Sequence, residues 1–104
     1  MILSTTATIA HKEITKTLGL VQGTTIRARH VGVDIVASIK ILVGGELTGY
    51  TKMMAGAREQ AMDRMVASAE ALNADAVVEI RMTTSTVTRG AAEILCYGTA
   101  VNLR

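Results

Sequence analysis

The stretch from Thr51 to Leu72 constrains the fold of this chain most, because its apolar residues recur with the period of an amphipathic helix. The three- and four-residue spacings place one set of small and apolar residues on a single face: Met54, Ala57, Ala61, Met65, Ser68 and Leu72, with Met62, Val66 and Ala69 beside them. The opposite face carries Lys52, Glu59, Asp63 and Glu70. Asn73 follows, and asparagine readily adopts the left-handed conformation that ends a helix. We therefore predict one long helix whose stripe packs on the core.

After Asn73 the pattern changes to the two-residue alternation of β-strands. Residues 76–88 and 92–103 form two such stretches, and the intervening Arg89-Gly90 is a turn signal, which predicts an antiparallel hairpin. The last strand is apolar on both sides, since Leu95, Tyr97, Val101 and Leu103 alternate with Ile94, Cys96 and Ala100. One helix covers only one face of a sheet, so we expect a neighbouring subunit to cover the other.

The first half of the chain is less regular. Four segments are distinguished: 2–8 as a small edge strand or an arm onto a neighbour, 11–17 as a connection, 18–31 as a strand with a bulge or bend at Gly23, and 34–43 as a short helix. The β-branched content of 34–43 also fits a strand, but its length and the following Gly44-Gly45 favour a helix. Residues 44–50 then link the helices, with Thr48 or Thr51 as the cap.

Together these segments predict an α+β protein, a two-layer α/β sandwich of β-α-β-β order. It has an antiparallel sheet, one long helix and a shorter preceding helix. A length of 104 residues with 49% hydrophobic residues is sufficient for a single domain spanning residues 1–104 with its own core.

Composition bears on partners and location. The chain has two Tyr and no Phe or Trp, and its net charge of +2 is scattered, so we expect no nucleic-acid binding. No apolar run reaches the length of a membrane span, and no leader of signal-peptide type precedes the chain, which predicts a soluble, cytoplasmic protein without membrane contact. Cys96 is the only cysteine, so no internal disulfide forms.

No metal or catalytic set stands out in the sequence. The conventional ligands His11, His30 and Cys96 have no ligand-like spacing, although a site shared between subunits stays open. Thioether sulfurs bind Cu(I), but the candidate methionines coincide with the predicted buried stripe and are interpreted as core: Met53, Met54, Met62, Met65 and Met82. We therefore assign no metal ligand and expect no tightly held zinc or copper.

Other polar groups have structural interpretations. The glycines of 44–49 match neither the P-loop nor the dinucleotide fingerprint, which favours a hinge. Glu79 and Glu93 lie on the hairpin strands and could face each other, but pairing with Arg81 or Arg89 is the simpler expectation. Cys96 lies in an apolar strand, which does not activate a thiol. We predict no catalytic residues.

An ordered set of short motifs resembles the bacterial YbjQ-like family, which is largely uncharacterised and also labelled a heavy-metal-binding domain. The set consists of Val43-Gly44-Gly45, Gly49-Tyr50, the long helix, residues 73–78 and residues 97–101. This chain has Asn73 and Glu79 where the family pattern has glycine. The resemblance implies a β-α-β-β fold and a ring-shaped homopentamer, but it transfers no ligand residue.

The sequence and the resemblance together thus predict a cytoplasmic, homo-oligomeric binding or scaffold protein of the YbjQ-like family, and metal ions are the ligand class that the family label implies. The alternative is an enzyme whose active site is assembled at subunit interfaces, and a purely structural ring is a third. Neither the ligand nor a cofactor follows from the sequence.

Overall fold

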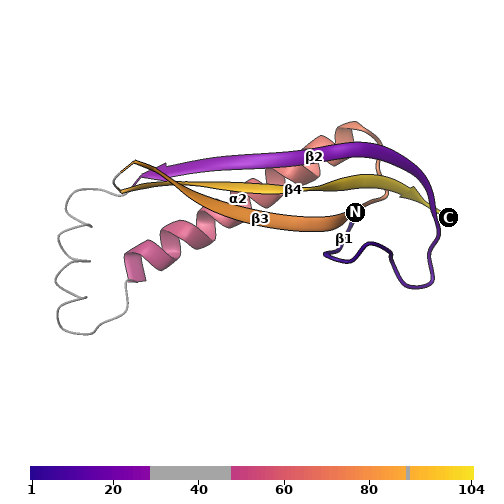
Figure 1. Cartoon of the computed structure of the whole chain (residues 1–104), viewed down its shortest axis with the longest axis horizontal. Helices are drawn as coiled ribbons and strands as arrows, with labels where there is room; N and C mark the ends of the chain where they lie inside the picture. Colours follow the sequence, from indigo (N-terminus) through magenta and orange to yellow (C-terminus); the bar gives the residue numbers. More distant parts are fainter. Residues whose placement is uncertain (29–47, 89) are drawn as a thin grey trace.

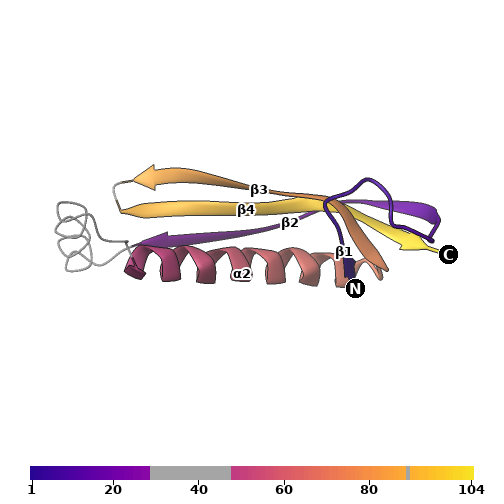
Figure 2. The same cartoon turned by 90° about the horizontal axis from the view of Figure 1, so that it is seen from below.

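The computed structural model describes residues 1–28, 48–88 and 90–104. Its elements are β1 (Ile2–Leu3), β2 (Ile14–Ala28), α2 (Thr48–Ala71), β3 (Ala76–Thr88) and β4 (Ala91–Leu103). The strands form one sheet in the order β1-β3-β4-β2, and α2 lies along one face of it (Figures 1 and 2). The expected α+β architecture with one sheet and one long helix is confirmed. The shorter helix predicted at 34–43 and most of the 44–50 link lie outside the described residues.

The order of the described elements is β-β-α-β-β rather than the predicted β-α-β-β. The added strand is β1, which pairs in parallel with β3 through Ile2–Ala76 and Leu3–Val77. The three long strands are antiparallel, as predicted, so the sheet is mixed only at this edge. A strand of two residues is too short to show the alternation of apolar and polar side chains. Ile2 and Leu3 form a strand because they pair with the otherwise free edge of β3. The edge-strand alternative for residues 2–8 is thereby confirmed for Ile2 and Leu3 only, because residues 4–8 are not in a strand.

Helix α2 begins three residues before the predicted start and ends at Ala71. Its end forms a Schellman motif: the amide of Ala74 donates to the carbonyl of Ala69 (3.1 Å) and that of Asn73 to Glu70 (2.9 Å). Asn73 has a φ of 59°, so its predicted left-handed conformation is confirmed.

The core lies between α2 and the sheet. The helix contributes Met54, Ala57, Ala61, Met65 and Ala69, and the sheet contributes Val21, Val77, Ile80, Ala92, Ile94, Cys96 and Ala100. From Ala57 the buried positions recur every fourth residue. Against the prediction, Ser68 is exposed, although its hydroxyl still donates to the carbonyl of Gln22 in β2 (3.5 Å), and Leu72 is exposed just beyond the end of the helix. The charged face is confirmed, because Lys52, Glu59, Asp63 and Glu70 are all exposed.

Strand β2 corrects two expectations. It begins at Ile14, so the second half of the predicted connection is strand, and its register shifts lie at Ile14/Lys16 and Thr17/Gly19. Gly23 pairs with Cys96 in unbroken register, so the predicted bulge there is wrong. The glycine has another cause: a Cβ at this position would lie 2.5 Å from the backbone nitrogen of Met65 in α2.

The hairpin is confirmed, with Thr88 paired to Ala91 and Gly90 at a φ of 77°. Strand β3 carries a bulge between Val78 and Arg81, where Glu79 has a φ of 57°. A left-handed conformation is easiest for glycine, so Asn73 and Glu79 both stand at positions where a glycine would carry no steric cost.

Candidate functional site

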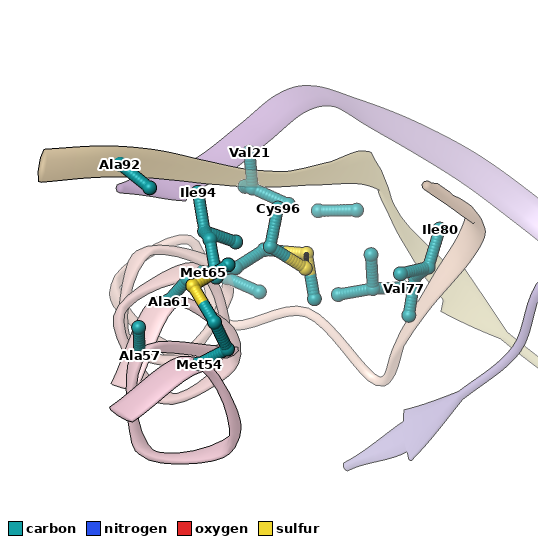
Figure 3. Packing of buried hydrophobic residues seen from close by; sticks show 12 residues of the cluster. Val21, Met54, Ala57, Ala61, Met65, Val77, Ile80, Ala92, Ile94 and Cys96 are labelled. Atoms are coloured by element: carbon teal, nitrogen blue, oxygen red, sulfur yellow. Dashed lines mark hydrogen bonds between the residues drawn. The ribbon is translucent and has the colours of Figure 1, made fainter. Parts of the chain in front are cut away.

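Three sulfur atoms meet between α2 and β4. The Sγ of Cys96 lies 3.5 Å from the Sδ of Met65 and 3.8 Å from the Sδ of Met62. Cys96 and Met65 point toward each other across the interface in Figure 3. The two methionines are three positions apart on α2 and therefore project from one helical face. We call Cys96, Met62 and Met65 the sulfur cluster.

The surroundings of the sulfur cluster are apolar. Cys96 and Met65 are fully buried, among core residues that include Val21, Ala61 and Ile94. Burial raises the pKa of the Cys96 thiol, so the group is a protonated, weakly donating S–H in the ligand-free protein. Met62 is only partly buried. Two of the three donors thus belong to fully buried residues and the third to a residue at the margin of the core.

The packing of β2 positions the cluster. Gly23 is the register partner of Cys96 on the neighbouring strand, and α2 passes directly over it. A Cβ there would meet the carbonyl of Ala61 and lie 2.8 Å from the Cβ of Arg64. The glycine thus allows a close helix–sheet approach, and that approach brings the Met65 sulfur within reach of the cysteine.

This donor set suits a soft metal ion. Thiolate and thioether ligands select ions such as Cu(I) over harder ones. Three sulfurs each about 2.3 Å from a shared ion in a trigonal arrangement would lie about 4 Å apart. The observed separations of 3.5 and 3.8 Å come close to this spacing. The residues therefore fit a metal ion after small side-chain shifts, which flexible methionines allow.

Sequence reasoning placed these residues correctly in the core but treated them separately. The expectation of no bound copper was based on the absence of a ligand cluster in the sequence. Because the three sulfurs lie together in the fold, that reason no longer applies. The sequence did contain part of the information, because the alternation along the last strand points Cys96 toward the core and the two methionines lie on the helical face that packs there. What was missing was the register between the elements.

The other candidate ligands do not gather. His11 is exposed in the segment before β2, and His30 lies outside the described residues. Within residues 1–28, 48–88 and 90–104 no three His, Cys, Asp or Glu side chains form a group that could hold a metal. Met54 is buried without a recorded sulfur contact, and Met82 is 38% exposed.

The hairpin carboxylates lie apart. Glu93 has Ser85 and Ile26 as its register partners, whereas Glu79 is in the β3 bulge. Glu79 forms an exposed ion pair with Arg81 at 3.6 Å, one of the two predicted partners. The possible facing of Glu79 and Glu93 is therefore wrong, since the bulge and the register separate them.

A second feature is the sheet face turned away from α2. The strand registers place Leu20, Ile26, Leu95 and Tyr97 on this face, which we call the open sheet face. Leu20 is 68% and Ile26 60% exposed. At the other end of the sheet, Val101 is covered by the chain's own N-terminal half through Ile9 and Ile14. The face of the sheet turned away from α2 is thus covered by residues of the same chain near Val101 and is exposed to solvent near Leu20 and Ile26.

Helix α2 is the one helix that the described residues contain, and it has no apolar stretch that could cross a lipid bilayer.

Comparison with known proteins places the chain in a family. A family model with the description "Putative heavy-metal-binding" matches residues 1–104. A "UPF0145 protein" from Methanosarcina acetivorans is 59% identical over 99% of this chain and 97% of its own length. Another from Clostridioides difficile is 56% identical over 99% and 92%, respectively. A crystal structure of a protein with unknown function from Pediococcus pentosaceus is similar in fold, with a TM-score of 0.63, 15% identity, and coverage of 100% and 98%.

Proposed function

The chain belongs to the YbjQ-like family, and from this membership we propose that it is a homo-oligomeric binding protein for heavy-metal ions. The observation that carries the proposal is the convergence of Cys96, Met62 and Met65. These three residues supply one thiol and two thioethers, the donor types that thiophilic metals prefer. Cys96 lies 31 residues from Met65 and 34 from Met62 along the chain, so the thiol meets the two thioethers only because the chain folds.

The open sheet face supports the oligomeric part of the proposal. On this face the apolar side chains of Leu20 and Ile26 are exposed, with the polar Gln22 and Thr24 between them, and exposed apolar side chains are a feature of protein interfaces. The assembly we propose is the ring-shaped homopentamer that the family resemblance implies. A cytoplasmic location is part of the same proposal, because a reducing compartment keeps the Cys96 thiol free to act as a ligand.

Native mass spectrometry tests both parts together. We expect the untagged, reduced protein loaded with Ag(I), a redox-inert thiophilic probe, to show a five-chain mass with one ion per chain after free ion is removed. Met54→Leu is the matched control, because it changes a buried methionine of the same helix whose sulfur is not one of the two that approach the Cys96 thiol, and it should keep the ion. Complete loss of Ag(I) on buffer exchange would refute metal binding, and a single-chain mass would refute the assembly.

A further inference from the structure

We infer that the sulfur cluster selects a monovalent thiophilic ion, with Cu(I) as the biologically available example, and rejects divalent Zn(II). This inference rests on the proposed function and names the class of ion that the site takes. It draws on three properties of the cluster: its charge, its number of donors and its position in the core.

Charge is the first argument. Cys96 is the only ionisable donor of the three, because a thioether has no proton to lose. A metal ion binds the thiolate form, so the thiol proton passes to water as the sulfur–metal bond forms. The donor set then carries one negative charge. A monovalent ion makes the filled site neutral, whereas a divalent ion leaves a net positive charge beside the fully buried Cys96 and Met65.

That residual charge is costly. An uncompensated ion transferred into an apolar interior loses its hydration, and the penalty is large unless a counter-charge lies beside it. Among the described residues no carboxylate is buried beside Cys96, and the acidic residues of α2 nearest the sulfur cluster, Glu59 and Asp63, are exposed. The surroundings are apolar side chains such as Val21, Ala61 and Ile94. The core therefore penalises Zn(II) and tolerates Cu(I).

The number and type of donors point the same way. Structural zinc sites use four ligands in a tetrahedral arrangement, drawn from Cys, His and carboxylates. The sulfur cluster offers three donors, two of them thioethers, and sulfur-only sites of this softness select Cu(I). Distances of 3.5 and 3.8 Å from the Cys96 sulfur suit three donors around one ion.

The position of the cluster adds a measurable consequence. Met62 and Met65 belong to α2 and Cys96 to β4, so an ion held by all three ties the helix to the sheet. A ligand that binds only the folded state raises the stability of that state. Met62 is the one residue of the three that is only partly buried. Cu(I) should thus raise the thermal midpoint of unfolding.

Competition for Cu(I) against a chromophoric chelator tests the inference on the full-length assembly under anaerobic, reducing conditions. We expect one Cu(I) per chain, a sulfur-only ligand shell in X-ray absorption, and a rise in the unfolding midpoint. Met62→Leu and Met65→Leu conserve volume and remove one donor each, and each should weaken Cu(I) binding by about tenfold or more. Met54→Leu should leave the affinity unchanged, and Zn(II) should bind far more weakly than Cu(I).

The possible outcomes separate the two proposals. Zn(II) bound as tightly as Cu(I), and weakened equally by Met65→Leu, would overturn the charge argument and leave heavy-metal binding intact. Cu(I) bound equally by wild type, Met62→Leu, Met65→Leu and Cys96→Ala would overturn the donor assignment. Failure of Cu(I), Ag(I) and Zn(II) all to bind would refute the proposed function itself. Should Cys96→Ala not fold, the two leucine variants decide the donor assignment alone.

Discussion

Gly23 and Met65 lie so close that a Cβ on the glycine would be 2.5 Å from the backbone nitrogen of the methionine. The strand and the helix therefore touch through their backbones at this point, next to the register partner Cys96. No side chain of β2 separates the two layers there. The spacing of the sulfur cluster depends on this contact.

Gly23→Ala should consequently lower the free energy of unfolding, by about 1–3 kcal/mol, because the added methyl group meets backbone rather than a movable side chain. Gly56→Ala is the matched control: nothing lies within 4 Å of its added Cβ, and it sits inside α2. It should raise stability by up to about 1 kcal/mol through helix propensity. Urea denaturation of both variants measures the difference. A Gly23→Ala protein as stable as wild type would mean that the close contact is not real.

Glu79→Gly should stabilise the protein. Glu79 has a φ of 57°, and the left-handed conformation costs a residue with a Cβ about 1–2 kcal/mol. Glycine removes this cost but gains entropy in the unfolded chain, so a net gain of about 0.5–1 kcal/mol is expected. Glu79→Ala also loses the exposed ion pair with Arg81 but keeps the Cβ, and it should show no gain. Thermal unfolding of the two variants distinguishes backbone strain from side-chain effects.

Local patterns were enough to predict α2, the hairpin and the Asn73 cap, because periodicity and capping act within one element. The sequence could not show why Gly23 is a glycine, since the cause is the backbone of α2, about forty residues away in the chain. The pairing of Ile2 with Ala76 could not be predicted either, because the two residues are far apart in the chain. The sulfur cluster was missed because it depends on which helix position faces which strand position, and residue spacing along the chain carries no record of that register.

The Cys96 thiol should make stability depend on pH in the alkaline range. Burial raises its pKa in the folded protein above the ordinary value of 9.0. The stabilising contribution of the protonated thiol is therefore fully present below pH 9. Above that pH the thiol ionises first in the unfolded chain, so the free energy of unfolding falls, by at most about 1.4 kcal/mol per pH unit. The free energy of unfolding of Cys96→Ala should fall less over this pH range, because the variant has no thiol to ionise. Urea unfolding of both proteins at pH 7, 9 and 10 measures it, and parallel curves would contradict the prediction.

Met65→Ala should destabilise the protein by about 2–5 kcal/mol, because Met65 is fully buried and the two layers around it cannot close the cavity. Asp63→Ala, on the exposed face of the same helix, should stay within about 0.5 kcal/mol. Chemical denaturation of the two single variants measures both. Similar losses at the two positions would mean that α2 presents a different face to the sheet.

Ile94 and Leu95 test the two faces of β4. Ile94 is fully buried beneath α2, whereas Leu95 points to the open sheet face. Ile94→Asp places an unpaired charge in the core and should unfold the subunit, with loss of the helical circular dichroism signal. Leu95→Asp places the same charge where we propose that another subunit docks, so it should keep that signal while the native mass falls to one chain. A Leu95→Asp protein that keeps the wild-type native mass would show that the open sheet face is not the interface, and a folded Ile94→Asp protein would show that α2 does not cover this strand.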